Sequence, residues 1–243
     1  MPGAMLNLEE AWRADTAILP AIAASCMIVS DILARHDEPQ RRYHGHNHLR
    51  SLVELITVHA PHILPGAPPR LAIWWHDAIY NPAARDNGER SADLARDHLS
   101  RLGASPEQIE ATAGLILMTK NHWSGPSAGD GDFFLDADIA ILGAPPRAYA
   151  AYAAGVREEY AWAPADAYRT GRASFLSAAM LRSCLFRTDV FEATYAGQAR
   201  ANMNCELEAL SAPGKGSASS TLPVSGFPTA LGRGRFTVPR CRR

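Results

Sequence analysis

Apolar residues recur along most of the chain at spacings of three and four, which is the period of an amphipathic helix. Residues 47–59 show the pattern most clearly, with the positions i, i+3, i+4 and i+7 filled by Leu49, Leu52, Val53 and Ile56. Similar stripes predict further helices over residues 16–35, 88–102, 147–162, 170–188 and 190–210. No alternating run rich in Val, Ile and Thr appears before the last thirty or so residues, so we predict an all-α fold.

Three more predicted helices carry stronger local signals. The stretch "LAIWWHDAIY", residues 71–80, is apolar on nearly every side, which predicts a buried helix. Ser105 precedes Pro106 and stands three residues before Gln108, the spacing of a capping box at a helix start. A short helix is predicted around "FFLDADIAIL", ending at Gly143 and the prolines that follow it. The first and third of these helices place charged side chains among large apolar ones.

Composition and charge divide the chain into two parts. The 243 residues are 47% apolar and 20% charged, which is ordinary for a globular protein. The net charge of −1 conceals a basic end, because residues 211–243 carry +6 and the body before them about −7. That end is rich in Gly, Ser and Pro and too poor in apolar residues to form a core. We therefore predict one helical domain over residues 1–210 and a disordered Gly/Ser/Pro/Arg tail over 211–243.

Several classes of partner and location fit this sequence poorly. An acidic body argues against a nucleic-acid surface, and no run approaches the roughly 18 apolar residues of a membrane span. The N-terminus lacks the features of a secretory leader, and the four cysteines form no CxxC pair. We expect free thiols and a cytoplasmic location. The basic tail could contact an acidic partner, nucleic acid or anionic lipid, although such tails usually only aid solubility.

Candidate metal chemistry begins with a cluster of histidines. The stretch "RRYHGHNHL" places His44, His46 and His48 within five positions, and the pair His76–Asp77 follows 28 residues after His48 in the most apolar stretch of the chain. Burying such a pair is costly unless its charge is compensated. A divalent cation binds carboxylate oxygen and imidazole nitrogen together, so we predict a metal site. The alternative is that Asp77 caps a helix and His76 bonds a carbonyl.

Two further stretches contribute candidates. "FLDADIAILG" contains Asp136 and Asp138. Positions two apart on a helix point in different directions, so we expect only one of these carboxylates to reach the pocket. His122 ends the preceding predicted helix, where a histidine often serves only to complement the helix dipole.

The order His…His-Asp…Asp resembles that of the HD superfamily of metal-dependent phosphohydrolases. Six ordered blocks, "RRYHGHNHL", "AIWWHDAIYNP", "DNGERSA", "LDADIAILG", "VREEY" and "GQARANMNCEL", are together similar to a bacterial subgroup of predicted HD-superfamily phosphohydrolases with domains of about 200 residues. The resemblance covers residues 5–210 and excludes the tail. It implies a compact all-α helical bundle in which these side chains converge on one or two divalent ions.

By position, the resemblance implies four metal ligands: His48, His76, Asp77 and Asp138. His44 ranks behind His48 as the first histidine, and His46 ranks third. Asp136 is the rival of Asp138. In subfamilies with two ions, extra histidines lie between the His-Asp pair and the last aspartate, so His122 is a possible ligand of a second ion.

The resemblance also suggests catalytic groups. Where the subgroup usually has Asn-Glu-Glu, this chain has Gly88 in place of one Glu, and Asp86 or Glu89 could supply the missing acid or orient water. Asp77 is a further carboxylate for that role. The cations that could grip a phosphate are Lys120, Arg157 and Arg200. For the two arginines the alternative is a structural ion pair between helices.

The function implied is hydrolysis of a phosphate ester or anhydride, with a small phosphorylated, nucleotide-like substrate and a metal-activated water. Mixed imidazole and carboxylate ligands suit Mn, Fe, Co, Ni or Zn better than Mg, which prefers oxygen. Two alternatives remain. One is an HD-type oxygenase with two irons, and the other is a metal- or nucleotide-binding regulatory module without turnover, which Gly88 favours. The sequence gives no oligomeric state.

Overall fold

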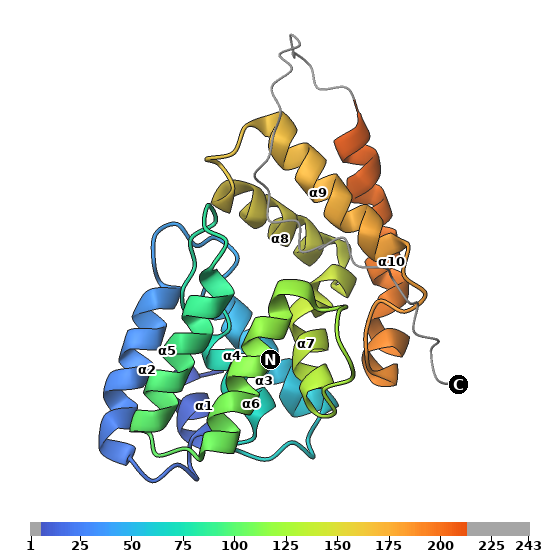
Figure 1. The fold of residues 1–243 in the computed structure, drawn as a ribbon. Coiled ribbons are helices and arrows are strands. Elements are labelled where there is room, and N and C mark those ends of the chain that lie inside the picture. Colours follow the sequence, from blue (N-terminus) through green and yellow to red (C-terminus); the bar gives the residue numbers. More distant parts are fainter. Residues whose placement is uncertain (1–5, 213–243) are drawn as a thin grey trace. The chain divides into compact units, whose positions relative to one another are not determined.

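The computed structural model describes residues 6–212, apart from the side chains of residues 22 and 23. Over that range it contains ten α-helices and two 3₁₀ helices and no strand (Figure 1), which confirms the all-α prediction there. Nearly all of the predicted tail lies outside the described residues. The chain divides into two compact units, Met1–Ile139 and Ala140–Arg243. Each is described separately below, and the single domain over residues 1–210 stays a prediction.

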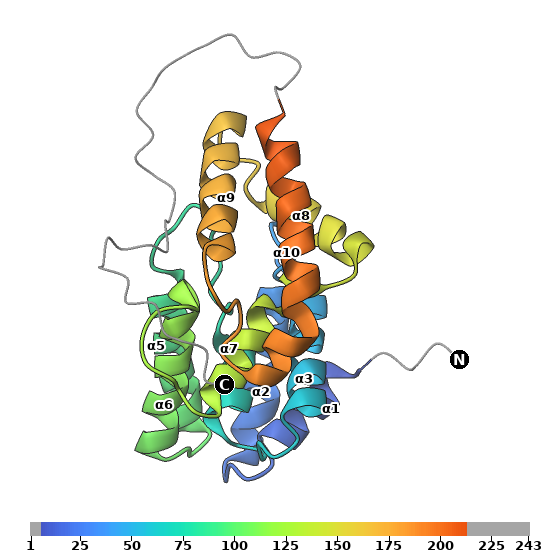
Figure 2. The ribbon, with the colours of Figure 1, turned by 90° about the vertical axis from the view of Figure 1, so that its right-hand side faces the viewer.

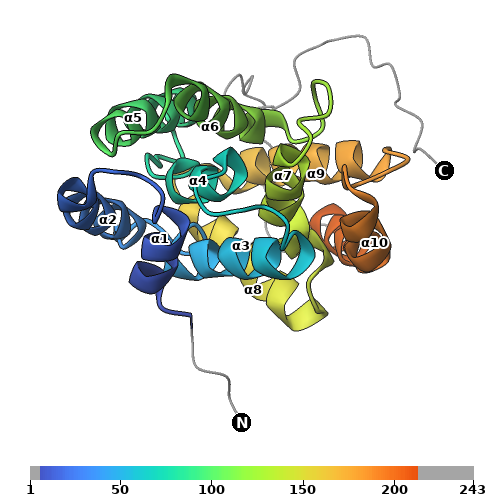
Figure 3. The ribbon, with the colours of Figure 1, turned by 90° about the horizontal axis from the view of Figure 1, so that it is seen from below.

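The first unit is built around one buried helix. Its elements are α1 (Leu8–Asp15), α2 (Ile22–His36), α3 (His46–His59), α4 (Pro68–Trp75), α5 (Asn87–Arg101), α6 (Pro106–Met118), η1 (Thr119–Asn121) and α7 (Gly131–Ile139). Helix α4 contacts α3, α5, α6 and α7. Figure 3 shows it between α3 and the α5–α6 pair. Its side chains from Leu71 to Trp75 are fully buried, as their apolar pattern predicted.

Aromatic and polar contacts hold α4 in place. Trp12 of α1 packs edge-on against Trp74 and Trp75, with ring centroids 5.3 and 5.4 Å away. The indole N–H of Trp74 donates to Asp15 Oδ2 at 3.1 Å, and that of Trp75 donates to His98 Nδ1 at 3.2 Å. Buried indole nitrogens usually need such partners. Because both tryptophans are anchored, the C-terminal end of α4 has a fixed position.

The helix predicted over residues 71–80 is shorter than expected. Helix α4 ends at Trp75 and a turn follows. The side chain of Arg41 donates from Nη1 to the backbone oxygen of Asp77 at 2.7 Å and from Nη2 to that of Ala78 at 3.2 Å. Those carbonyls are therefore occupied by a side chain from a distant loop, and they accept no bond from a continuing helix.

Other helix starts follow their sequence signals to different degrees. The capping box of α6 is confirmed, because Ser105 Oγ accepts from the Gln108 backbone N–H at 3.3 Å and Gln108 Oε1 accepts from the Ser105 N–H at 2.9 Å. The predicted helix over residues 16–35 begins only at α2, after Pro20. Helix α1 was not predicted, although Asn7 caps it.

The second unit contains η2 (Ala140–Gly143), α8 (Pro146–Glu159), α9 (Ala165–Met180) and α10 (Asp189–Ser211). Helix α10 contacts both η2 and α9, and Figure 2 shows α9 and α10 side by side. The approach to η2 is close, since a Cβ added at Gly143 would lie 2.5 Å from the backbone oxygen of Tyr195. Asn202 Nδ2 donates to the carbonyls of Leu142 and Ala144, both at 2.8 Å.

Two expectations about the environment of the chain can be compared with the described residues. Cys26 and Cys205 are free and exposed, as expected, but Cys184 is disulfide-bonded, so the expectation of free thiols is wrong for that residue. Among the helices of residues 6–212, none has the length and apolar character needed to cross a membrane.

Candidate metal site

Three helices of the first unit bring their side chains to one buried point. His48 comes from the first turn of α3, His76 follows the last residue of α4, and Asp138 comes from the last turn of α7. The two Nε2 atoms of the histidines are 3.0 Å apart. Asp138 Oδ1 lies 3.1 Å from His48 Nε2 and 3.5 Å from His76 Nε2. These three residues form a group that could hold a metal ion.

The spacing of the ligand atoms fits a single ion. Two ligands about 2.1 Å from an ion, at an angle of about 90° to 110°, are about 3.0 to 3.4 Å from each other. The separations of 3.0, 3.1 and 3.5 Å match this range closely. Both imidazoles are almost fully buried, so water does not readily take the place of an ion beside them. The donor set and its geometry therefore fit a divalent cation.

The backbone fixes the orientation of His76. Its Nδ1 lies 2.9 Å from the carbonyl oxygen of Ile73, so Nδ1 donates a hydrogen bond to that carbonyl and Nε2 points at the cluster. Metal-binding histidines are commonly oriented in this way. His46 has a different role, because its Nε2 lies 2.8 Å from the carbonyl oxygen of Leu33 on α2. It anchors the start of α3 and does not belong to the ligand group.

Asp77 lies at the rim of the cluster. Its Oδ2 is 3.2 Å from His76 Nε2 and 3.8 Å from His48 Nε2, and its side chain is 22% exposed. Arg41 holds its backbone, as described above, and also donates to the carbonyl of His44 at 3.0 Å. One buried guanidinium thus ties the histidine-rich loop to the turn that carries Asp77. Nothing in the sequence showed that Arg41 turns inward.

The two remaining histidine candidates differ in their contacts. His122 Nε2 lies 2.7 Å from Asp138 Oδ2, so one oxygen of Asp138 faces His122 and the other faces the histidine pair. The ring of His44 lies 5.7 Å from that of His48 and 4.5 Å from that of Tyr80. His122 therefore orients Asp138 directly, whereas His44 lies beside the group.

The electrostatics of the cluster show what a cation would replace. Burial lowers the pKa of His48 despite the neighbouring Asp138. Burial acts on His76 in the same direction, but Asp77 and Asp138 outweigh it and raise the pKa of His76 well above its usual value. Burial would raise the pKa of both carboxyl groups, yet His76 holds each below its usual range. Without a metal, a proton on His76 supplies the positive charge that an ion would bring.

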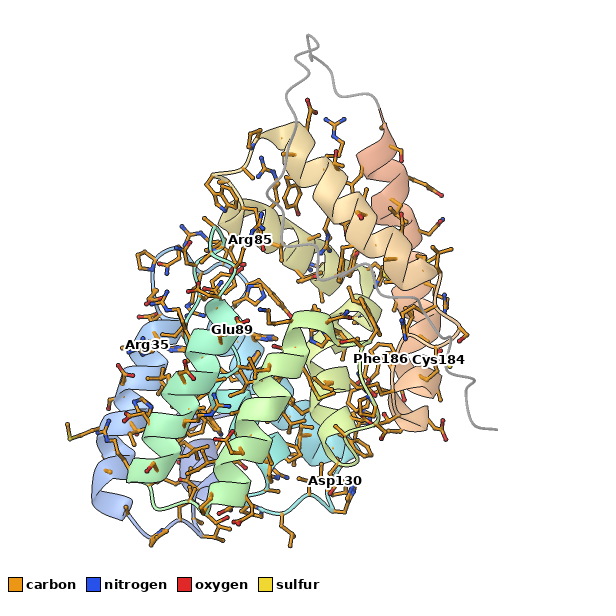
Figure 4. The ribbon with its side chains drawn as sticks, viewed as in Figure 1. Arg35, Arg85, Glu89, Asp130, Cys184 and Phe186 are labelled. Carbon is orange, nitrogen blue, oxygen red and sulfur yellow. The ribbon has the colours of Figure 1, made fainter. Side chains whose placement is uncertain are left out.

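Gly88, which stands where the resembling subgroup usually has a Glu, lies beside two of the candidate catalytic groups, Lys120 and Glu89. The Lys120 ammonium pairs with the Glu89 carboxylate, at the start of α5 where Figure 4 labels Glu89. A Cβ added at Gly88 would lie 3.1 Å from Lys120 Cγ, so glycine leaves room for the lysine stem. This pairing lowers the pKa of Glu89. Asp86 is exposed and makes no capping bond.

The other candidate residues lie outside the ligand group of His48, His76 and Asp138. Asp136 is buried but is not part of the ligand group, in agreement with the expectation that only one of the two aspartates reaches it. Arg157 and Arg200 belong to the second unit. Arg200 donates to the carbonyls of Met180, Arg182 and Ser183. It thus completes the end of α9, and within the described residues it does not form the structural ion pair that was its alternative role.

Comparison of the chain with protein-family models, with curated proteins and with solved structures finds no match. The resemblance to HD-domain proteins therefore rests on the sequence motifs, and the metal site rests on its own geometry.

Proposed function

We propose that this protein is a metal-dependent phosphohydrolase of the HD type, acting on a phosphate ester or anhydride of a nucleotide-like molecule. The convergence of His48, His76 and Asp138 at metal-ligand spacing in a buried position carries the proposal. The order of the same residues along the chain, with Asp77 beside His76, supports the HD assignment. We infer a functional site here because, within the described residues, neither Asp77 nor Asp138 forms an ion pair with a lysine or an arginine.

The donor set limits the choice of ion. Two imidazole nitrogens and one or two carboxylate oxygens suit Mn, Fe, Co, Ni or Zn better than Mg. Such an ion supplies Lewis acidity toward a phosphoryl oxygen and lowers the pKa of a water molecule. His48, His76 and Asp138 would hold it, and Asp77 lies close enough to contribute a fourth ligand.

The chain's own residues can then do three things. Asp77 is partly exposed and its pKa is held low by His76, so its carboxylate can accept a hydrogen bond from a water and orient it. His122 fixes Asp138 through Oδ2. Lys120 is 44% exposed, and its one ion-pair partner among the described residues is the half-exposed Glu89, a contact that costs little to exchange. Its ammonium can therefore turn to a phosphoryl oxygen.

The test combines metal analysis with activity. The full-length protein is stripped of metal and reloaded with each candidate ion, then assayed on phosphomonoesters, phosphodiesters and nucleotides. We expect at least one transition metal to restore turnover, and the double variant His76→Ala/Asp77→Ala to lose both metal and turnover. His62→Ala, which changes an exposed histidine, should match the wild type. If no ion binds and none restores turnover, the proposed function is wrong.

One observation favours a second candidate. The two oxygens of Asp138 face different histidines, so Asp138 and His122 would be the residues to hold a second ion, which an oxygenase with two irons would need. Two irons per chain, an iron-dependent optical band and oxygen uptake would select that function. A regulatory module would be selected by tight nucleotide binding with no product after long incubation.

A further inference from the structure

The second unit contains a pocket between α8, α9 and α10 that the proposed hydrolase function does not use. Its volume is about 330 Å³, at the lower end of the range for small-molecule sites. The side chains that matter for its chemistry are Ala153, Arg157, Tyr168, Arg169, Glu206 and Leu210. Two of these are cations and one is an acid, so the charge available to a ligand depends on which are already paired.

The acid is fully paired within the protein. Arg172 donates to Glu206 from Nε at 2.8 Å and from Nη2 at 3.0 Å, and the Tyr149 hydroxyl donates to the same carboxylate. Arg172 is itself buried and also donates to the Tyr152 hydroxyl at 3.0 Å. The negative charge of Glu206 is therefore neutralised where it lines the pocket.

The cations are not neutralised to the same extent. The guanidinium of Arg157 lies 4.7 Å from the ring centroid of Tyr168, and its Nη1 donates to the carbonyl of Tyr160 at 2.8 Å. Within the described residues no carboxylate pairs with Arg157, which leaves most of its five N–H donors available. Arg169 pairs with Asp166 at 3.4 Å in an exposed position, a contact of little strength. The pocket thus offers two guanidinium groups and a positive charge.

We propose that this pocket binds a small organic oxyanion, a phosphate monoester or carboxylate carried on an apolar body. Arg157 and Arg169 grip the oxyanion, because a guanidinium matches two oxygens of such a group with parallel N–H bonds. Ala153 and Leu210 contact the apolar body. Tyr168 and the Tyr160 carbonyl hold the Arg157 side chain in place before the ligand arrives, which reduces the entropy lost on binding. This role differs from the one first expected for Arg157 at the metal site.

Calorimetric titration of the full-length, metal-stripped protein tests the proposal with four probes: phenyl phosphate, benzoate, inorganic phosphate and phenol. We expect phenyl phosphate, benzoate or both to bind with a Kd of about 1 mM or tighter. Inorganic phosphate lacks the apolar body and phenol lacks the oxyanion, so each should bind at least about tenfold more weakly. The comparison of phenyl phosphate with benzoate shows which oxyanion is preferred.

Variants locate the binding. Arg157→Met should weaken the preferred probe at least about tenfold, and Arg169→Met should weaken it as well. Because Arg169 is partly exposed, its variant stays informative if Arg157→Met does not fold. Arg147→Met changes an exposed arginine on the same helix outside the pocket and should bind like the wild type.

A further variant separates this site from the metal site. His76→Ala should leave binding of the probe unchanged, whatever its effect on hydrolysis. Absence of binding by all four probes, or unchanged affinity in both pocket variants, would overturn the proposal. Loss of binding in His76→Ala would also overturn it, since the oxyanion would then sit at the metal site.

Discussion

Each unit buries a cluster of charged side chains, and the two clusters are balanced in different ways. In the second unit, Arg172 binds Glu206 through two hydrogen bonds, so a fixed protein cation meets the buried carboxylate. In the first unit, Asp77 and Asp138 have only imidazoles as ion-pair partners within the described residues. The buried Arg41 nearby donates to backbone carbonyls of the loop and turn instead.

The difference separates a structural cluster from a binding site. Burying a carboxylate is costly, and the cost must be offset by a nearby positive charge. Arginine is always charged, so the second cluster is complete without any ligand. An imidazole carries a charge only when it is protonated, and a metal ion can take the place of that proton. The cluster in the first unit can therefore accept a cation, whereas the cluster in the second unit needs none.

The largest expected effect is a loss of stability on removal of Arg172, the fixed cation of the second unit. Arg172→Met leaves Glu206 buried without its partner and should lower the free energy of unfolding by about 3–5 kcal/mol. Urea unfolding measures this loss. The double variant Arg172→Met/Glu206→Leu should recover much of it, because no charge is then left unpaired. A single variant that loses less than about 1 kcal/mol would show that Arg172 does not balance the cluster.

In the first unit, removal of a ligand should act on metal affinity. Asp138→Ala should weaken metal binding by a factor of about 100 or more, since even indirect contacts to a metal ligand contribute 10- to 100-fold. Competition with a chromophoric chelator gives the affinity. Asp130→Ala is the matched control, because Asp130 is an exposed aspartate just before α7 (Figure 4). Equal affinities for the two variants would exclude Asp138 as a ligand.

A third buried group, His36, extends the comparison to an ionisable side chain that is buried in its neutral form. His36 is buried, its Nδ1 bonds the Ile32 carbonyl at 2.9 Å, and its Nε2 has no hydrogen-bond partner among residues 6–212. Burial, helped by the charge of Arg41, lowers the pKa of His36 from 6.5 to about 3. As the pH falls below 6.5, the unfolded chain therefore takes up a proton that the folded chain refuses. Stability is present at pH 7 and is lost on acidification.

The corresponding variant is His36→Asn, which keeps a donor for the Ile32 carbonyl and removes the titration. Between pH 7 and pH 5, the free energy of unfolding of the wild type should fall by about 2 kcal/mol more than that of this variant. Urea unfolding at the two pH values measures it. His62→Asn, at an exposed histidine, should retain the wild-type pH dependence. An unchanged slope in His36→Asn would mean that His36 is protonated in the folded protein.

The smallest effect concerns Arg41, which positions the metal site without touching the ligand atoms. Arg41→Met should weaken metal binding about tenfold, as loss of an outer contact does, and should alter the visible spectrum of bound Co²⁺. Arg41→Lys should retain part of the metal affinity and of the wild-type Co²⁺ spectrum, because lysine keeps a hydrogen-bond donor. A variant that is less stable but has the wild-type affinity and spectrum would limit Arg41 to a structural role.

The sequence predicted these features unequally. Polar residues inside apolar stretches pointed to His76, to Asp77 and to one of Asp136 and Asp138, because a charge among large apolar side chains needs a partner whatever the fold. The choice of His48 and of Asp138 came from the resemblance to HD-domain proteins. The end of α4 could not be predicted, since it depends on Arg41, a residue 36 positions before Asp77. The sequence named Arg157 as a possible phosphate-binding cation, but it could not show the pocket, whose walls come from three helices. Local patterns fix helices and their apolar faces, whereas contacts between distant segments decide which polar side chains meet.

A titration of the metal-stripped, full-length protein with Co²⁺, followed by visible absorbance and by proton release, tests the central claim most directly. We predict at least one Co²⁺ bound per chain at neutral pH, with ligand-field bands and release of a proton from the histidine cluster. Both signals should be lost in His48→Ala. The account would be contradicted if Co²⁺ did not bind, or if it bound equally well after His48 had been removed.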